Sequence, residues 1–146
     1  MTNHAKTCKG FVERYLGRAW TSADGLPEKD VKKAEARLGF TLPTALRTFY
    51  LCVGAVGELC SIHNKILHPK DLVVEEGYLM FMDENQSVVS WGIRRKDLKK
   101  SNPKVWQRNN SSEDWCSEGK NLLDLLASMF DWYEELGLWA PSDEKR

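Results

Sequence analysis

The chain has 146 residues, of which 42% are hydrophobic and 29% are charged, and its formal net charge is zero. This size and composition are typical of one globular domain with one hydrophobic core, so we expect a single domain over residues 1–146. No apolar run is long enough to cross a bilayer, and we therefore expect no membrane insertion.

The charge is distributed unevenly along the chain. Residues 93–108 hold seven Lys or Arg against one Asp, whereas residues 113–146 hold nine Asp or Glu against three Lys or Arg. Such a basic segment suits nucleic acid, an acidic partner, or a solvated loop that the acidic C-terminal part balances. Because no series of aromatic residues is spaced through the basic run, we expect no nucleic-acid binding.

The cysteine pattern indicates a reducing compartment. The four cysteines form no Cys-x-x-Cys pair, and no apolar segment of signal-peptide type stands at the N-terminus. We therefore expect a cytoplasmic protein whose cysteines are free thiols, mostly buried as small hydrophobic residues.

Three helices are expected in the first third of the chain. Apolar residues recur at helical spacing in residues 4–19, and again after Pro27 and after Pro43. Proline suits the first turn of a helix, and Gly39 suits the end of the second helix. The predicted buried positions are Phe11, Val12, Tyr15, Val31, Ala34, Leu38, Leu46, Phe49, Tyr50 and Val53.

Residues 77–94 predict a β-hairpin. The apolar run at residues 78–82 is typical of a strand that is covered on both faces. Turn-forming residues follow at 83–86, and the next run alternates between apolar and small or polar residues. Its predicted inner face contains Val89, Trp91 and Ile93.

The register of this hairpin depends on the length of its loop. A two-residue loop at Asn85 and Gln86 would pair Met82 with Val89, whereas a three-residue loop would pair Phe81 with Val89. Neither Asn-Gly nor Asp-Gly is present to force a tight turn, so both registers remain open.

The C-terminal part predicts one more strand and one helix. Trp115 is placed on a late strand, and Gly119 is expected to open a last helix whose apolar residues fit helical spacing from Leu122 to Tyr133. Residues 141–146 have nothing to bury and are expected to fray. Helices, then antiparallel strands, then a helix predict an α+β domain.

Familiar catalytic and metal-binding patterns are absent from the sequence. It contains no nucleophile elbow, phosphate loop or dinucleotide motif, and its histidines lack Cys or carboxylate neighbours at zinc spacing. The nearest acid pairs are Glu75-Glu76 and Asp83-Glu84, but neighbouring strand residues point to opposite faces. We therefore expect no enzyme, no cofactor and no metal site.

Several segments together resemble the SUKH superfamily. They are Glu35-x-x-Leu38-Gly39-Phe40-x-Leu42-Pro43-x-x-Leu46-Arg47, then Glu84-Asn85-Gln86, Val88-Val89 and Trp91-Gly92-Ile93. The superfamily includes fungal cell-wall-synthesis regulators of the Smi and Knr type and many bacterial immunity proteins. The resemblance covers roughly residues 10–133. It implies a mainly antiparallel sheet of about four to six strands, with a strand near residues 103–107, packed against N-terminal helices and one C-terminal helix.

The resemblance also implies a non-enzymatic protein-binding domain. Bacterial members of the superfamily act as immunity proteins that bind and occlude a cognate toxin, often a nuclease. The alternative is a regulatory or scaffold module of the fungal type. The expected partner-binding residues are an acidic patch able to mimic phosphate and two tryptophans that suit an interface, namely Glu75, Glu76, Asp83, Glu84, Trp106 and Trp115. Monomer and homodimer both remain open.

Overall fold

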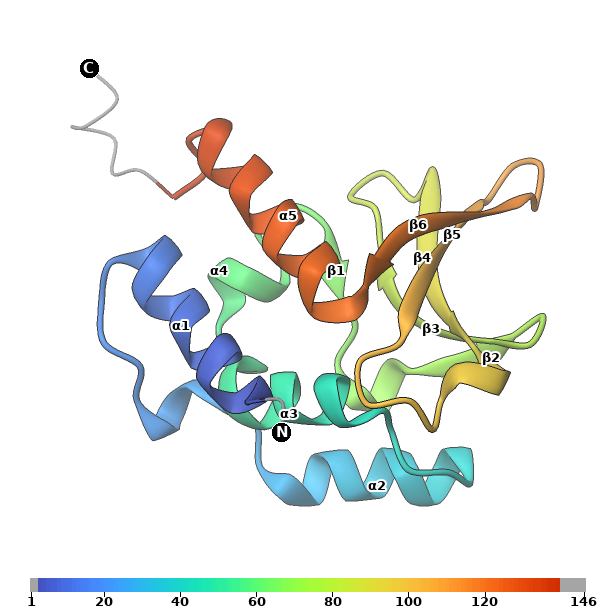
Figure 1. The fold of residues 1–146 in the computed structure, drawn as a ribbon, viewed down its shortest axis with the longest axis horizontal. Coiled ribbons are helices and arrows are strands. Elements are labelled where there is room, and N and C mark those ends of the chain that lie inside the picture. The colour runs from blue at the N-terminus through green and yellow to red at the C-terminus, as the bar shows by residue number, and fades with distance from the viewer. Residues whose placement is uncertain (1–2, 140–146) are drawn as a thin grey trace.

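A group of helices lies beside one curved antiparallel sheet in the computed structural model, which describes residues 3–139 (Figure 1). The helices are α1 (His4–Leu16), α2 (Glu28–Leu38), α3 (Thr44–Val53), α4 (Gly57–Cys60) and α5 (Leu122–Glu135). The strands are β1 (Lys65–Ile66), β2 (Val73–Glu75), β3 (Tyr78–Asp83), β4 (Val89–Arg94), β5 (Lys104–Asn109) and β6 (Trp115–Asn121). Short 3-10 turns are η1 (Ser22–Asp24), η2 (Pro69–Asp71) and η3 (Arg95–Asp97). The α+β prediction is confirmed, and the predicted frayed tail lies outside the described residues.

The helix ends follow local capping. Asn3 and Asn121 each accept a hydrogen bond from a backbone N–H in the first turn of α1 and α5. Gly17 ends α1 with φ 68°, so this helix stops short of the predicted residue 19. The prediction that Gly119 opens the last helix is wrong, because β6 continues through Gly119 to Asn121.

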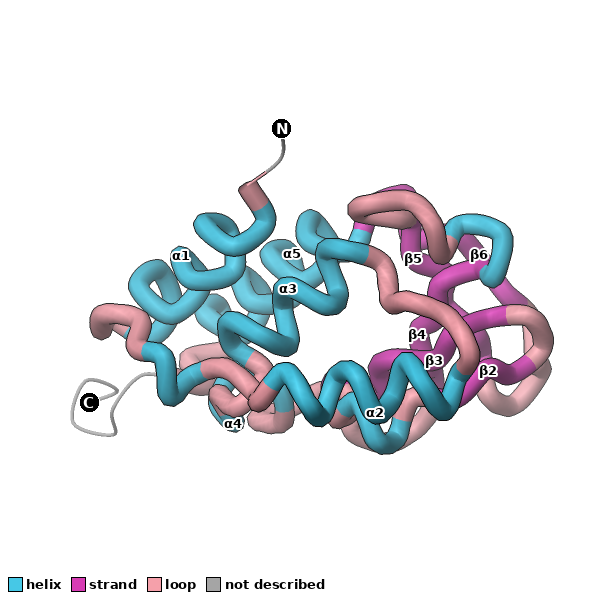
Figure 2. Tube along the Cα trace, turned by 90° about the horizontal axis from the view of Figure 1, so that it is seen from below, coloured by secondary structure: helices cyan, strands magenta, loops and turns pink. Residues whose placement is uncertain are grey.

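The middle strand of the sheet is β4. The strand order is β1-β3-β4-β5-β6, and β2 also pairs with β3 beyond the end of β1. Figure 2 shows the helices grouped on one side of the molecule and the strands on the other, with α2 reaching from the helical group toward the sheet. One face of the sheet therefore meets the helices and the other does not.

Neither predicted register of the central hairpin occurs. Met82 pairs with Trp91 and not with Val89, and the register shifts between Met80 and Met82, so that Phe81 occupies a bulge. The inner position predicted for Trp91 is confirmed, because this side chain is buried within the hydrophobic core.

The hairpin loop explains the error in register. The Glu84 carboxylate accepts hydrogen bonds from the backbone N–H groups of Gln86 and Val88, and Ser87 adopts a positive φ of 60°. These contacts stabilise a loop longer than either predicted form. The sequence carries no Asn-Gly signal for such a loop, because its stabilising acceptor is a side chain next to the turn.

The core fills the space between the helices and the inner face of the sheet. Phe11 of α1 packs edge-on against Phe130 of α5, with ring centroids 5.2 Å apart. The buried Tyr50 hydroxyl donates to the Leu67 carbonyl at 2.6 Å, which joins α3 to the segment after β1. The largest buried apolar side chains also include Phe49, Phe81, Leu46, Leu59, Leu72, Leu79, Met82, Ile93 and Leu122.

The cysteines are free, as predicted; Cys8 and Cys52 are buried, and Cys60 is half-buried. Burial raises the pKa of the Cys8 and Cys60 thiols to about 12, so both remain protonated at neutral pH. Cys116 is exposed on β6. Among residues 3–139, no helix is long and apolar enough to span a membrane.

Two glycines provide a matched test of this packing. A Cβ atom on Gly25 would lie 1.8 Å from the Leu51 carbonyl oxygen of α3, whereas Gly10 in the interior of α1 has open space around it. We expect Gly25→Ala to lower the free energy of unfolding by about 3 kcal/mol through overpacking. Gly10→Ala should raise it by about 0.5–1 kcal/mol because alanine favours a helix. Urea denaturation measures both, and equal stabilities would contradict the contact between the Gly25 loop and α3.

Candidate functional site

The sheet curls strongly, and its face away from the helices is concave. Tyr78 is paired with Arg94 at one end of β3 and β4, whereas Trp115 is paired with Arg108 at the opposite end of β5 and β6. In a flat sheet these corners would lie about 20 Å apart. Their rings instead stack with centroids 3.5 Å apart and planes inclined by 6°.

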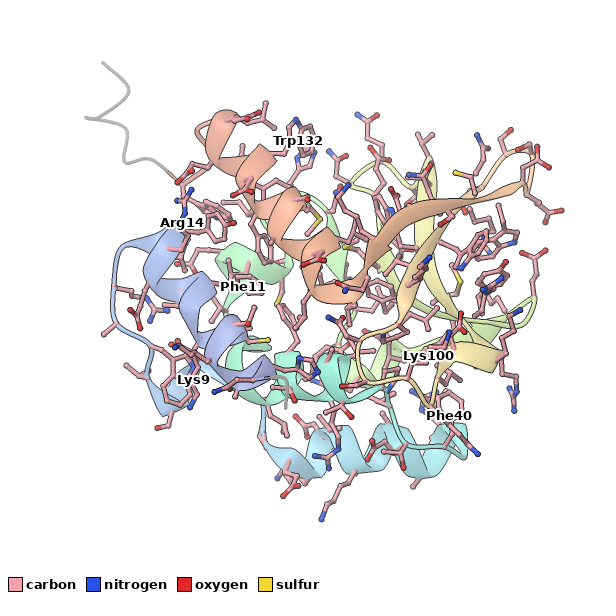
Figure 3. The ribbon with its side chains drawn as sticks, viewed as in Figure 1. Lys9, Phe11, Arg14, Phe40, Lys100 and Trp132 are labelled. Atoms are coloured by element: carbon pink, nitrogen blue, oxygen red, sulfur yellow. The ribbon has the colours of Figure 1, made fainter. Side chains whose placement is uncertain are left out.

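The two hairpins that carry these rings extend away from the helices in the same direction (Figure 1). Figure 3 shows that side chains occupy the space between the β5–β6 hairpin and the β2–β3 turn. We call this surface the concave face. It contains the outward-pointing residues Glu75, Tyr78, Met80, Ser90, Arg94, Trp106, Arg108 and Trp115, together with Glu76 and Gly92.

Arg108 connects the aromatic stack to the acidic residues of the concave face. Its guanidinium carbon lies 5.7 Å from the centroid of the Trp115 ring. Its Nη1 donates to Glu75 at 3.1 Å and to Glu76 at 3.3 Å, and its Nε donates to Asn110 at 2.9 Å. The side chain is only 18% exposed, so these contacts hold a largely buried cation in one orientation.

Glu75 and Glu76 reach the same cation, although adjacent strand residues were expected to point apart. The reason is the two-residue turn between β2 and β3, in which Glu76 has φ 55° and Gly77 has φ 83°. Two positive φ values are typical of a type I′ hairpin turn. The turn takes Glu76 out of the strand and lets its carboxylate approach Arg108.

A groove of about 430 Å³ lies on the concave face. Its wall includes the carboxylates of Asp71, Glu75 and Asp83, with Arg108 as the only basic residue among its lining residues. Asp83 also accepts a hydrogen bond from Ser90 Oγ at 2.8 Å. Three carboxylates against one guanidinium give this acidic groove a net negative charge.

The structure separates the six predicted partner-binding residues. Glu75, Glu76 and Asp83 lie at or beside the acidic groove, whereas Glu84 stabilises the hairpin loop. Trp106 and Trp115 are both half-buried, and Trp106 lies under Arg94, whose guanidinium carbon is 4.5 Å from the ring centroid.

Sequence reasoning missed three residues of this surface. The sequence places Tyr78 only in an apolar run, and Arg108 only in a basic segment for which a solvated loop is the stronger interpretation. Asp71 lies in the short turn η2 and reaches the groove only through the fold. The spacing of Trp106 and Arg108, two residues apart, would place both on one face of a strand and was the available signal for this surface.

The model of the SMI1 / KNR4 family (SUKH-1) matches residues 25–135. The chain belongs to this family. No curated protein and no solved structure matches it. The matched range begins after α1 and includes the whole sheet, so the concave face lies within the SUKH domain. Membership supports a protein-interaction role, since SUKH domains are generally non-enzymatic and bind proteins.

The chemistry of the concave face suits recognition of a protein. Half-buried Tyr, Trp and Arg side chains are the residue types that dominate binding energy at interfaces. The glutamates and the guanidinium are already paired, so a partner meets a preformed surface. Among residues 3–139, no group of three or more His, Cys, Asp or Glu is placed to hold a metal ion.

The basic segment of the SUKH domain contains one buried carboxylate. Asp97 accepts from Arg94 Nε at 3.2 Å and lies 3.1 Å from Lys100 Nζ. Burial alone would raise the pKa of Asp97, but its hydrogen bonds with Lys100 and Arg94 outweigh that effect and hold the pKa below the usual value. Asp97 thereby neutralises part of the positive charge that the sequence concentrates here.

The aromatic stack predicts an energetic coupling between β3 and β6. We expect a double-mutant cycle of Tyr78→Ala and Trp115→Ala, followed by urea denaturation, to give a coupling of about 0.5–1.5 kcal/mol. In the control cycle, Trp132→Ala on α5 is used in place of Trp115→Ala. Its change in the free energy of unfolding should add to that of Tyr78→Ala within about 0.5 kcal/mol. Additivity in the first cycle would contradict the contact between the corners.

The Asp97 ion pairs predict a pH dependence of stability. A folded-state pKa below the unfolded value of about 3.9 stabilises the fold above that pH, and this contribution disappears as the pH falls through the folded pKa. We expect Asp97→Asn to be about 1–2 kcal/mol less stable than wild type at pH 7, with the difference shrinking below about pH 4. Thermal unfolding across this range measures it, with exposed Asp114→Asn as the control. A difference that is independent of pH would refute the assignment.

Proposed function

We propose that this SUKH domain is an immunity protein that binds a cognate toxin through the concave face and occludes its active site. The observation that carries the proposal is the Tyr78–Trp115 stack held against Arg108 beside the acidic groove. Such a surface offers aromatic anchors and a preset electrostatic pattern on the same face. Family membership supports protein binding in general, and the identity of the partner is the proposed part.

The charge of the acidic groove suits a nuclease. An enzyme that cleaves nucleic acid presents a basic cleft to the phosphate backbone, and carboxylates placed like phosphates complement such a cleft. Asp71, Glu75 and Asp83 supply these carboxylates, with Arg108 holding Glu75 in place. Electrostatic complementarity of this kind accelerates association and discriminates against wrong partners.

Occlusion requires no chemistry from the SUKH domain. A stable protein interface involves about 20–30 residues on each partner, more than line the groove, so it would extend onto the surrounding strands. Trp106 and Glu76 lie next to the groove residues and would join such an interface. The bound domain would then block substrate access sterically while its carboxylates compete for the basic cleft.

A growth assay tests this function directly. The neighbouring open reading frame is expressed alone and then together with the SUKH domain, and the two proteins are co-purified. We expect killing that the domain relieves and a one-to-one complex. Killing that persists, or the absence of any complex, would contradict immunity. Several unrelated partners recovered from the native cell would instead identify the regulatory or scaffold module.

Variants then locate the interface on the concave face. We expect Trp115→Ala, and separately the combined Glu75→Gln, Glu76→Gln and Asp83→Asn variant, to weaken toxin binding by at least about 30-fold, as measured by calorimetry. Trp132→Ala provides the matched control, because this tryptophan is 44% exposed on α5, away from the concave face (Figure 3). Circular dichroism verifies folding, and undiminished binding by both variants would refute this interface.

A further inference from the structure

We propose that the SUKH domain has a second docking surface, which binds an acidic segment of a protein that carries an apolar side chain. It is a groove of about 560 Å³ between the α2–α3 connection and the η3 segment. We call it the basic groove. Its apolar lining comes from Phe40, Leu42, Pro43 and Leu98, and its charged lining from Arg95 and Lys99.

The walls of the basic groove are fixed by backbone contacts. The Ala45 N–H at the start of α3 donates to the Ser101 carbonyl at 2.8 Å, which joins one wall to the other. The Arg95 N–H donates to the Gly77 carbonyl at 2.9 Å, which anchors η3 to the β2–β3 turn. The groove is therefore a preformed feature, and an incoming segment would not need to order it.

The charge around the basic groove is left partly uncompensated. Buried Asp97 pairs with Arg94 and Lys100, so it offsets cations that lie beside the groove. Arg95, Lys96 and Lys99 are exposed, and these three form no ion pair within residues 3–139. Two of them, Arg95 and Lys99, line the groove together with its apolar residues, which favours a carboxylate-rich partner.

The apolar floor distinguishes a protein segment from nucleic acid. Among residues 3–139, Phe40 is the only aromatic residue that lines the groove, and the Arg95 guanidinium carbon lies 5.9 Å from its ring centroid. Single-stranded nucleic acid prefers a series of stacking rings along a basic track. A pocket that combines Leu42, Leu98 and one ring suits a single apolar side chain, with acidic neighbours reaching Arg95 and Lys99.

This second surface is independent of the proposed toxin interface. In the described part of the chain, the acidic groove is lined by three carboxylates and one cation, whereas the basic groove is lined by Arg95 and Lys99 without a carboxylate. Figure 3 labels Phe40, which lines the basic groove, and Lys100, which follows the lining residue Lys99, where the chain after α2 approaches the chain after β4. Partners of opposite charge would therefore use the two surfaces, and failure of one proposal leaves the other intact.

Selection from a random peptide library displayed on phage tests the basic groove with an unbiased probe. The bait is the folded domain, and the parallel bait is its Arg95→Glu, Lys99→Glu variant. We expect the peptides retained by the wild type to pair Asp or Glu with Leu, Ile, Phe or Trp. The affinity of their synthetic forms should fall by about tenfold or more on the variant, and should weaken with added salt.

The matched control changes the same charge elsewhere. Exposed Lys65 and Lys120 lie on β1 and β6, and Lys65→Glu, Lys120→Glu should leave peptide affinity unchanged. Phe40→Ala should weaken binding without altering charge. The proposal is overturned if no retained peptide depends on Arg95 and Lys99, or if the retained peptides lack acidic residues. Binding of single-stranded RNA at this groove in place of the peptides would also overturn it.

Discussion

The concave face depends on one constraint, the curl that brings opposite corners of the sheet into contact. Two irregularities favour it, the bulge at Phe81 in β3 and the register shift between β5 and β6 where Gly119 has φ 73°. Gly92 allows β3 and its side chains to approach closely, because a Cβ there would lie 3.0 Å from both the Tyr78 Cβ and the Met80 Sδ. The Tyr78–Trp115 stack closes the curl, and Arg108 and its glutamates are arranged around it.

The zero net charge of the chain conceals two surfaces of opposite sign. Carboxylates from η2, β2 and β3 gather at the acidic groove, while cations that follow β4 surround the basic groove. Buried Asp97 lies between Arg94 and Lys100 and offsets one of the two positive charges that they carry. In a domain with two surfaces of opposite charge, electrostatic attraction favours different partners at each surface during the first encounter.

The helices and strands of this fold could be predicted where the spacing of apolar residues is regular over a whole segment. The stripes of α1, α2, α3 and α5 repeat with helical spacing, and the hairpin strands are bounded by turn residues. The register could not be predicted, because the Glu84 side chain stabilises a longer loop without an Asn-Gly or Asp-Gly signal, and no sequence pattern marks the bulge at Phe81. The role of Gly119 could not be predicted either, because its positive φ occurs within strand β6 and not at the start of the last helix.

The sequence by itself determined the fold class, the family resemblance and the acidic and aromatic residue types expected at an interface. The tertiary structure alone decided which of them meet, because residues far apart in sequence become neighbours only when the sheet curls. Glu84 was expected in the acidic patch but stabilises the hairpin loop instead. Asp71, Tyr78 and Arg108 were not expected there but lie on the concave face or line its groove. Local patterns record the periodicity of burial, whereas a recognition surface depends on long-range geometry.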